Sequence, residues 1–219
     1  MISGSAVALL ALVFAGGTAL ATPTTATFDL NVISSGVGVT GSVGTVTMTE
    51  VSSTEVDLAV NLGIVNGYQT VFAKTGGPHI PFAFNLDSSV LGTALVSIIS
   101  PASAFTVVTG GANATPYGNY TTGILCNGCG NGTSKPNYSA VTVKVTNAGG
   151  INISDFIKNT AGYYVAADVG VNGSTGSVAS DLTHITGQTP PPVPEPASFA
   201  ILGVALAGLA FARRRASAA

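Results

Sequence analysis

The chain has 219 residues, of which only 7% are charged, and its formal net charge is −2. Its arginines, Arg213, Arg214 and Arg215, lie close to the C-terminus, so residues 22–186 carry four lysines against eight carboxylates. No basic patch is available to neutralise phosphates, which excludes nucleic acid as a partner. The length is sufficient for one domain with a hydrophobic core.

The N-terminus has the pattern of a secretory signal. Residues 6–16 form an apolar run that is too short to span a bilayer and has the length of a signal-peptide core. Ala19 and Ala21 supply the two small residues of a cleavage site. No Lys or Arg precedes the run, which departs from the usual pattern, and a buried N-terminal helix is the alternative. We predict a signal peptide at residues 1–21 and an exported mature chain.

Residues 22–186 show the alternation of β-strands. In residues 56–62 (VDLAVNL) every branched apolar side chain falls on one face, and Gly, Asn and Pro clusters separate this run from similar ones. The expected strands are residues 27–33, 45–51, 56–62, 68–73, 82–86, 94–99, 104–108, 120–125, 141–145 and 163–169. One short helix is expected at residues 154–158, with Ser154 as N-cap. This pattern predicts an all-β domain, an antiparallel sandwich or jelly roll.

The two cysteines of the chain, Cys126 and Cys129, flank an Asn-Gly turn. In an exported chain this spacing favours a disulfide. Free thiols, a zinc site completed by distant histidines, and a redox pair are the alternatives. We expect the disulfide, and we expect neither a metal nor another cofactor.

Catalytic chemistry has few candidates here. His79 and His184 are the two histidines, and no Gly-x-Ser-x-Gly nucleophile sequence is present. Four carboxylates could in principle form an acid pair in space. They are Asp57, Asp87, Asp155 and Asp168. Sequence distance alone does not pair them, so we predict no catalytic residue and a protein that is not an enzyme.

Thr45, Thr47 and Thr49 alternate along one expected strand, which places their side chains on one face. A regular rank of threonines can order water and bind ice or a flat polysaccharide surface. The alternative is that threonine is present because it favours β-structure on a surface strand.

The C-terminus combines a proline-rich linker at residues 187–196, an apolar run and a basic cluster within residues 197–219. The prolines stop a helix from extending backwards, and the apolar run can be satisfied in lipid only as a helix. Arg213 to Arg215 would hold its far end in the cytoplasm. The sixteen residues from Ala197 to Ala212 reach about 24 Å, which is short of the roughly 30 Å hydrocarbon core. This short transmembrane helix suits a transient anchor, with an ordinary single-pass anchor as the alternative.

This order of parts, with Pro194-Glu195-Pro196 before the apolar run and Arg213-Arg214-Arg215 after it, closely resembles the PEP-CTERM sorting signal. The resemblance covers residues 193–215. It implies processing by an exosortase, a transient inner-membrane intermediate, and delivery to the cell surface or extracellular matrix of a Gram-negative bacterium.

Proteins with this tail often accompany exopolysaccharide and biofilm formation, so exopolysaccharide is a candidate partner. The tail carries no activity that could be transferred to the β domain. The leading hypothesis is therefore a structural surface protein of the exopolysaccharide layer. A carbohydrate- or ice-binding module and a polysaccharide hydrolase are the two alternatives.

Overall fold

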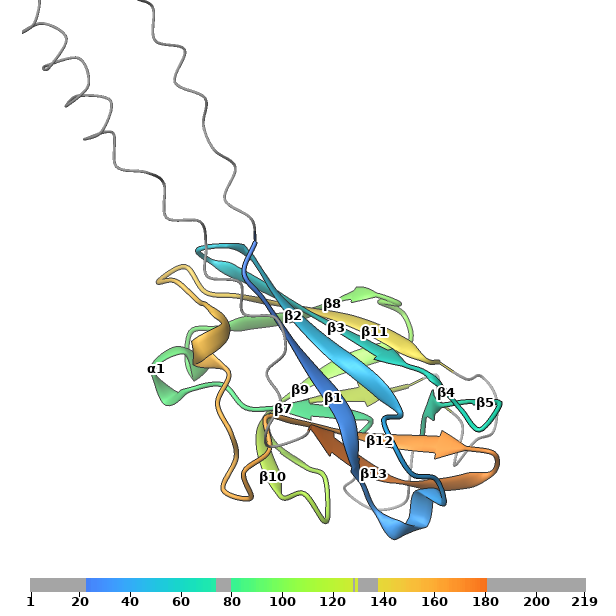
Figure 1. The fold of residues 1–219 in the computed structure, drawn as a ribbon. Coiled ribbons are helices and arrows are strands. Elements are labelled where there is room, and N and C mark those ends of the chain that lie inside the picture. The colour runs from blue at the N-terminus through green and yellow to red at the C-terminus, as the bar shows by residue number, and fades with distance from the viewer. Residues whose placement is uncertain (1–22, 74–79, 128, 130–137, 181–219) are drawn as a thin grey trace, which may run out of the picture. The chain divides into compact units, whose positions relative to one another are not determined.

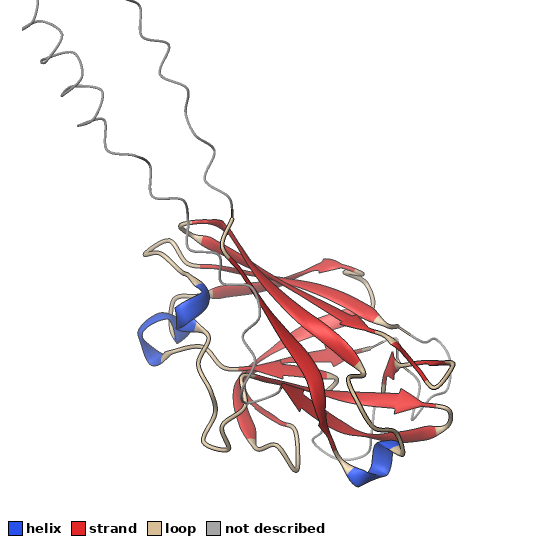
Figure 2. Cartoon of the chain, viewed as in Figure 1, coloured by secondary structure: helices blue, strands red, loops and turns tan. Residues whose placement is uncertain are grey.

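The structure is a computed structural model that describes residues 23–73, 80–127, 129 and 138–180. These residues belong to one compact unit, Pro23–Pro190. They form thirteen strands, one short α-helix and two 3₁₀ helices (Figures 1 and 2). The strands are β1 (Thr25–Ile33), β2 (Gly44–Ser52), β3 (Glu55–Leu62), β4 (Ile64–Val65), β5 (Tyr68–Gln69), β6 (Val71–Phe72), β7 (Phe82–Phe84), β8 (Leu95–Ser100), β9 (Phe105–Asn113), β10 (Asn119–Cys126), β11 (Ala140–Thr146), β12 (Val165–Val171) and β13 (Ser174–Ser180). The helices are η1 (Ser35–Val37), α1 (Ser88–Leu91) and η2 (Ile153–Asp155).

Every expected strand coincides with an observed one, except that residues 68–73 divide into β5 and β6. The prediction of an all-β antiparallel fold is confirmed, because every strand pair is antiparallel. Four elements were not expected: the 3₁₀ helix η1, the hairpin strand β4, the helix α1 and the strand β13.

The predicted helix at residues 154–158 is wrong in its position and its cap. The chain forms a single 3₁₀ turn, Ile153–Asp155, and its N-cap is Asn152 rather than Ser154. The Asn152 side chain accepts from the Ser154 N–H at 2.8 Å, and the Asp155 carboxylate accepts from the Asn152 N–H at 2.9 Å. This reciprocal capping box satisfies the free N–H groups at the start of the turn. The N-cap of the turn therefore lies two residues before the predicted N-cap.

The strands form two layers that share one strand. The first sheet has the order β8-β11-β3-β2-β1, and the second has the order β1-β13-β12-β7-β10-β9, with β6 beside β12. Residues 25–29 of β1 pair with β2, and residues 30–33 of the same strand pair with β13. A register shift between Leu30 and Val32 marks the point where β1 passes from one sheet to the other. The two sheets of the sandwich are therefore joined by backbone pairing through β1.

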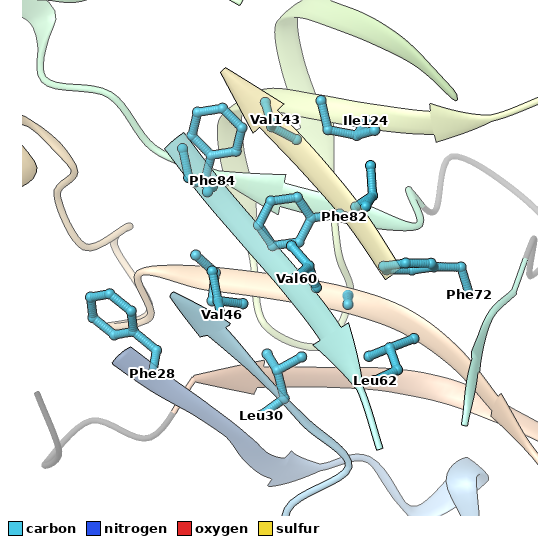
Figure 3. Packing of buried hydrophobic residues seen from close by; sticks show 14 of the residues in the cluster. Phe28, Leu30, Val46, Val60, Leu62, Phe72, Phe82, Phe84, Ile124 and Val143 are labelled. Atoms are coloured by element: carbon cyan, nitrogen blue, oxygen red, sulfur yellow. The ribbon is translucent and has the colours of Figure 1, made fainter. Parts of the chain in front are cut away.

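The main core lies between the two sheets. Val46, Val60 and Val143 project from the first sheet toward Phe82 and Phe84 of the second (Figure 3). The three valines and both phenylalanines are almost completely inaccessible to solvent. Burial of these alternate side chains drives the pairing of the layers and determines which residues face outward.

The second sheet is also covered on its outward face. Ala83, Ala166 and Ala179 lie there under a small apolar cluster that includes Tyr117 and Ile80. As a result, every residue of β12 is buried. The outward side chains of β1, β2, β3 and β11 are, in contrast, mostly half-buried, so this face of the first sheet remains accessible to solvent.

Candidate functional site

The candidate site is the outward face of the first sheet, which we call the threonine face. Seven of its side chains are uncharged and lie in rows: Thr25, Thr27, Thr45, Thr47, Thr49, Thr142 and the central Ala59; Asp29, Asp57 and Lys144 lie on the same side of the sheet. All seven side chains are half-buried, and their chain neighbours in the four strands are apolar and buried in most cases. Alternation of β-branched threonine with core residues both favours strand formation and directs the hydroxyls to one side.

The strand register aligns these residues in rows across the sheet. Thr27 pairs with Thr47, Thr47 with Ala59, and Ala59 with Thr142. The Oγ1 atoms of Thr27 and Thr47 are 3.4 Å apart. Because neighbouring strands are about 4.8 Å apart and alternate residues about 6.8 Å apart, the hydroxyls and methyls form a two-dimensional lattice.

The next row starts with threonines and ends with charges. Thr25 pairs with Thr49, Thr49 with Asp57, and Asp57 with Lys144. Lys144 forms an ion pair with Glu55, whose Oε1 lies 2.8 Å from Nζ. The charged groups therefore occupy the β3–β11 side of this row, and the row from Thr27 to Thr142 is uncharged.

Asp57 lies next to this ion pair on the same face. Burial and the neighbouring Glu55 carboxylate raise the pKa of Asp57, and the Lys144 ammonium partly opposes the shift. Among the described residues, no group forms a hydrogen bond with the buried Oδ1 of Asp57. Two carboxylates thus lie close together, but on an open sheet face rather than in a cleft.

Two of the predicted acid candidates serve as helix caps. The Asp87 carboxylate accepts from the Ser89 N–H at 2.8 Å at the start of α1, and Asp155 belongs to the capping box of η2. The structure does bring their backbones together, because the Asp87 N–H donates to the Asp155 carbonyl at 2.8 Å. Each carboxylate is nevertheless committed to N–H groups of its own turn.

Asp168 occupies a different environment. It lies on β12 with no solvent-accessible surface, and the Ser177 hydroxyl donates to its Oδ1. The same hydroxyl approaches the Thr115 carbonyl oxygen at 2.8 Å. The register aligns Asp168 with Ser177 across the β12–β13 hairpin, so this carboxylate joins two strands inside the fold.

The predicted disulfide is confirmed. Cys126 and Cys129 are bonded, with their Cα atoms 5.3 Å apart. Cys126 is the last residue of β10 and pairs with Phe105 of β9, so the bond fixes the chain at the end of this hairpin.

Several predictions fall on residues that the structure does not describe. His79 and His184, the sorting residues Pro194 to Pro196, and the cleavage residues Ala19 and Ala21 are among them. Within the described part of the chain, no three His, Cys, Asp or Glu side chains are placed to hold a metal ion. No helix in that part is long and apolar enough to cross a membrane.

The sequence pointed to Thr45, Thr47 and Thr49 but not to the residues beside them. Thr25 and Thr27 show the same alternation and were detectable as a second rank. That this rank lies directly against the first depends on the β1–β2 register. Ala59 and Thr142 belong to the face because β3 pairs with β2 and β11 pairs with β3. No sequence pattern around these two residues indicated this position.

Comparison with known families matches residues 192–215 to the PEP-CTERM protein-sorting motif. The match includes Pro194-Glu195-Pro196 and the three arginines, as the sequence predicted. Neither the comparison with curated proteins nor the comparison with solved structures found a match.

The motif and the fold together define an exported β-sandwich protein of the cell surface that an exosortase processes. By this motif, the chain is a PEP-CTERM domain-containing protein. The motif describes the tail and says nothing about what the threonine face binds.

Proposed function

We propose that the protein is a structural, non-enzymatic component of the exopolysaccharide or biofilm layer. The sorting motif at residues 192–215 carries this proposal, because it directs the β-sandwich to the cell surface. The composition supports it: a surface of Thr, Ser, Asn and Gly with few charges can form hydrogen bonds with sugar hydroxyls without requiring counterions.

The placement of the acid candidates supports a non-enzymatic role. Asp87 and Asp155 cap turns, and Asp168 is buried against Ser177. Asp57 has a carboxylate neighbour in Glu55 but lies on an open face. A glycosidase needs two carboxyl groups on opposite sides of one bound sugar, with one of them protonated.

The test of this proposal is a search for turnover. The exported protein is incubated with soluble β-glucans, alginate and exopolysaccharide of the host, and new reducing ends are measured. We expect none above the level of a heat-denatured control. Turnover that disappears in Asp57→Asn, while Asp87→Asn retains it, would replace the structural proposal with a hydrolase.

A carbohydrate- or ice-binding module is the second candidate function. The specific observation in its favour is the uncharged row of Thr27, Thr47, Ala59 and Thr142 across four strands. A flat lattice of hydroxyls and methyls complements a regular hydroxylated surface, and rigid strands lose little entropy on binding.

This second candidate is tested by retention on insoluble polysaccharide, with ice adsorption measured in parallel. Ala59→Lys places a long charged side chain in the centre of the face and should reduce retention about tenfold or more. Ala148→Lys is the matched control, because it makes the same change at an exposed loop position beyond β11. Equal retention of both variants would exclude the threonine face as the binding surface.

A further inference from the structure

The first sheet ends in β8, whose outer edge is not paired with any strand in the described part of the chain. β8 (Leu95–Ser100) pairs with β11 on its other side. Its sequence, LVSIIS, contains no charge and no proline. Edge strands are usually protected by charges, prolines, bulges or a covering element, because their free N–H and C=O groups can pair with another chain.

The exposed side chains of this edge are apolar. Leu95 is 73% exposed and Ile99 is 44% exposed, both high values for large aliphatic residues. β8 pairs with β11 residue by residue from Leu95 to Ile98. A register shift follows, because Ile99 has no partner in β11. The strand is thus a short uncharged β-segment held extended at the surface, which is the kind of segment that favours strand pairing.

The pattern of β8 is self-complementary. Leu95-Val96-Ser97-Ile98-Ile99 has two apolar residues on each side of Ser97. Antiparallel pairing about a two-fold axis through Ser97 opposes Val96 with Ile98 of a second copy, and Ser97 with its own equivalent, while Ile99 lies at the register shift that ends the regular segment. Because opposed residues share a face in such a pair, exposed side chains meet exposed ones and inward side chains meet inward ones.

We propose that β8 is a homodimerisation edge, where two copies of this chain pair antiparallel and join their first sheets into one. An extended strand with free backbone groups is matched by another extended strand, and the symmetry about Ser97 makes a second copy the fitting partner. A recess of about 460 Å³ next to this edge, lined in part by Leu91, Ala94 and Val96, adds apolar surface that the second copy would cover.

Charge does not oppose this pairing. In the described part of the first sheet, Lys144 of β11 pairs with Ser97 and forms an ion pair with Glu55. The two Lys144 side chains of a dimer would be three strand spacings apart, about 14 Å, which exceeds the Debye length of about 8 Å at physiological ionic strength.

The dimer has a consequence for the proposed surface function, although it does not depend on that function. In this pairing the outward faces of the two first sheets lie on the same side. The two threonine faces therefore form one continuous surface, and simultaneous engagement of both raises the apparent affinity for an extended polymer.

Sedimentation velocity of the exported protein over a concentration series tests the inference. We expect a monomer–dimer equilibrium. Ser97→Lys places two ammonium groups opposite each other at the two-fold axis and should weaken dimerisation about tenfold or more. Ala59→Lys, which is outward-facing on β3, is the control that should leave dimerisation unchanged. A protein that stays monomeric at all concentrations, or a dimer that Ser97→Lys leaves intact, would overturn the proposal.

Crosslinking reports the register of the pair, because two positions of the same strand are compared. In the proposed pair the Cβ atoms of two Ser97→Cys side chains are about 5 Å apart, so a short bismaleimide should link them efficiently. Ser100→Cys is the matched control, because its two copies would be about 20 Å apart. Equal crosslinking of both variants would contradict the register. The variants separate this inference from the binding function, since Ala59→Lys tests the face and Ser97→Lys tests the edge.

Discussion

Gly123 illustrates how closely the outward cluster of the second sheet is packed. A Cβ at this position of β10 would lie 2.6 Å from Ile80 Cδ1 and 2.7 Å from Ala112 Cβ. The Ile80 side chain can rotate away, but the Ala112 Cβ is fixed to the backbone of β9. We therefore expect Gly123→Ala to lower the free energy of unfolding by about 1–3 kcal/mol in urea titrations.

Gly92 provides the matched control for this substitution. It follows α1 with φ −76°, and a Cβ added there would meet no atom of the surrounding fold within 4 Å. Gly92→Ala should raise stability by roughly 0.4–1 kcal/mol, because alanine restricts the unfolded chain. If Gly123→Ala were no more destabilising than Gly92→Ala, this would contradict the close packing of Ala112 on β9 against Gly123 on β10.

The carboxyls Asp57 and Asp87 should respond to pH with opposite signs. Burial and Glu55 raise the pKa of folded Asp57 above its ordinary value of 3.8, so the folded state binds this proton more tightly than the unfolded state. Stability attributable to Asp57 is then present below pH 3.8 and is lost as the pH rises through the folded value. Relative to wild type, Asp57→Asn should gain stability as the pH rises through this window.

Asp87 shows the reverse behaviour. Hydrogen bonds from Ser89 lower the pKa of its carboxyl below 3.8, so its contribution to stability is present above 3.8 and is lost as the pH falls through the folded value. Asp87→Asn keeps a good N-cap but does not titrate, so its deficit relative to wild type should shrink in acid. Urea titrations between acid and neutral pH measure both differences. Parallel pH profiles for the two variants would contradict the assigned environments.

At the scale of elements, the disulfide stabilises the end of β10. Closing so short a loop contributes about 2 kcal/mol in the chain-entropy model. We expect the double substitution Cys126→Ala with Cys129→Ala to lower the free energy of unfolding by about this amount. Thiol labelling of the denatured, unreduced wild type should find neither cysteine reactive. Labelling of both cysteines, or stoichiometric zinc on purification, would contradict the bond.

The unexpected strands show which local signals matter. Asn66-Gly67 and Asn172-Gly173 both have positive φ at both residues, the conformation of a type I′ hairpin turn. These dipeptides were present in the sequence and would have predicted β4–β5 and β12–β13. The strand β13 itself (STGSVAS) has no apolar alternation. Its extended conformation therefore depends on the hairpin turn and on pairing with β1 and β12.

At the scale of the whole molecule, we predict that processing removes both ends of the chain. Intact-mass analysis of the surface-released protein should show a chain that starts at Thr22, after Ala19-Leu20-Ala21, and ends near Pro194–Ser198. The reason is that the sorting motif at residues 192–215 marks the tail for exosortase processing. A mature surface protein that still carries Arg213–Arg215 would contradict this prediction.

The sequence by itself determined the sorting motif, the all-β class, most strand positions and the disulfide, because each of these depends on local patterns. A period of two, a proline-flanked apolar run and two cysteines around a turn are all readable within a few residues. Tertiary structure alone decided that β1 joins both sheets, that every residue of β12 is buried, and that Thr27, Thr47, Ala59 and Thr142 form one row. These features depend on strand order and register, which arise when distant segments bury their apolar faces together.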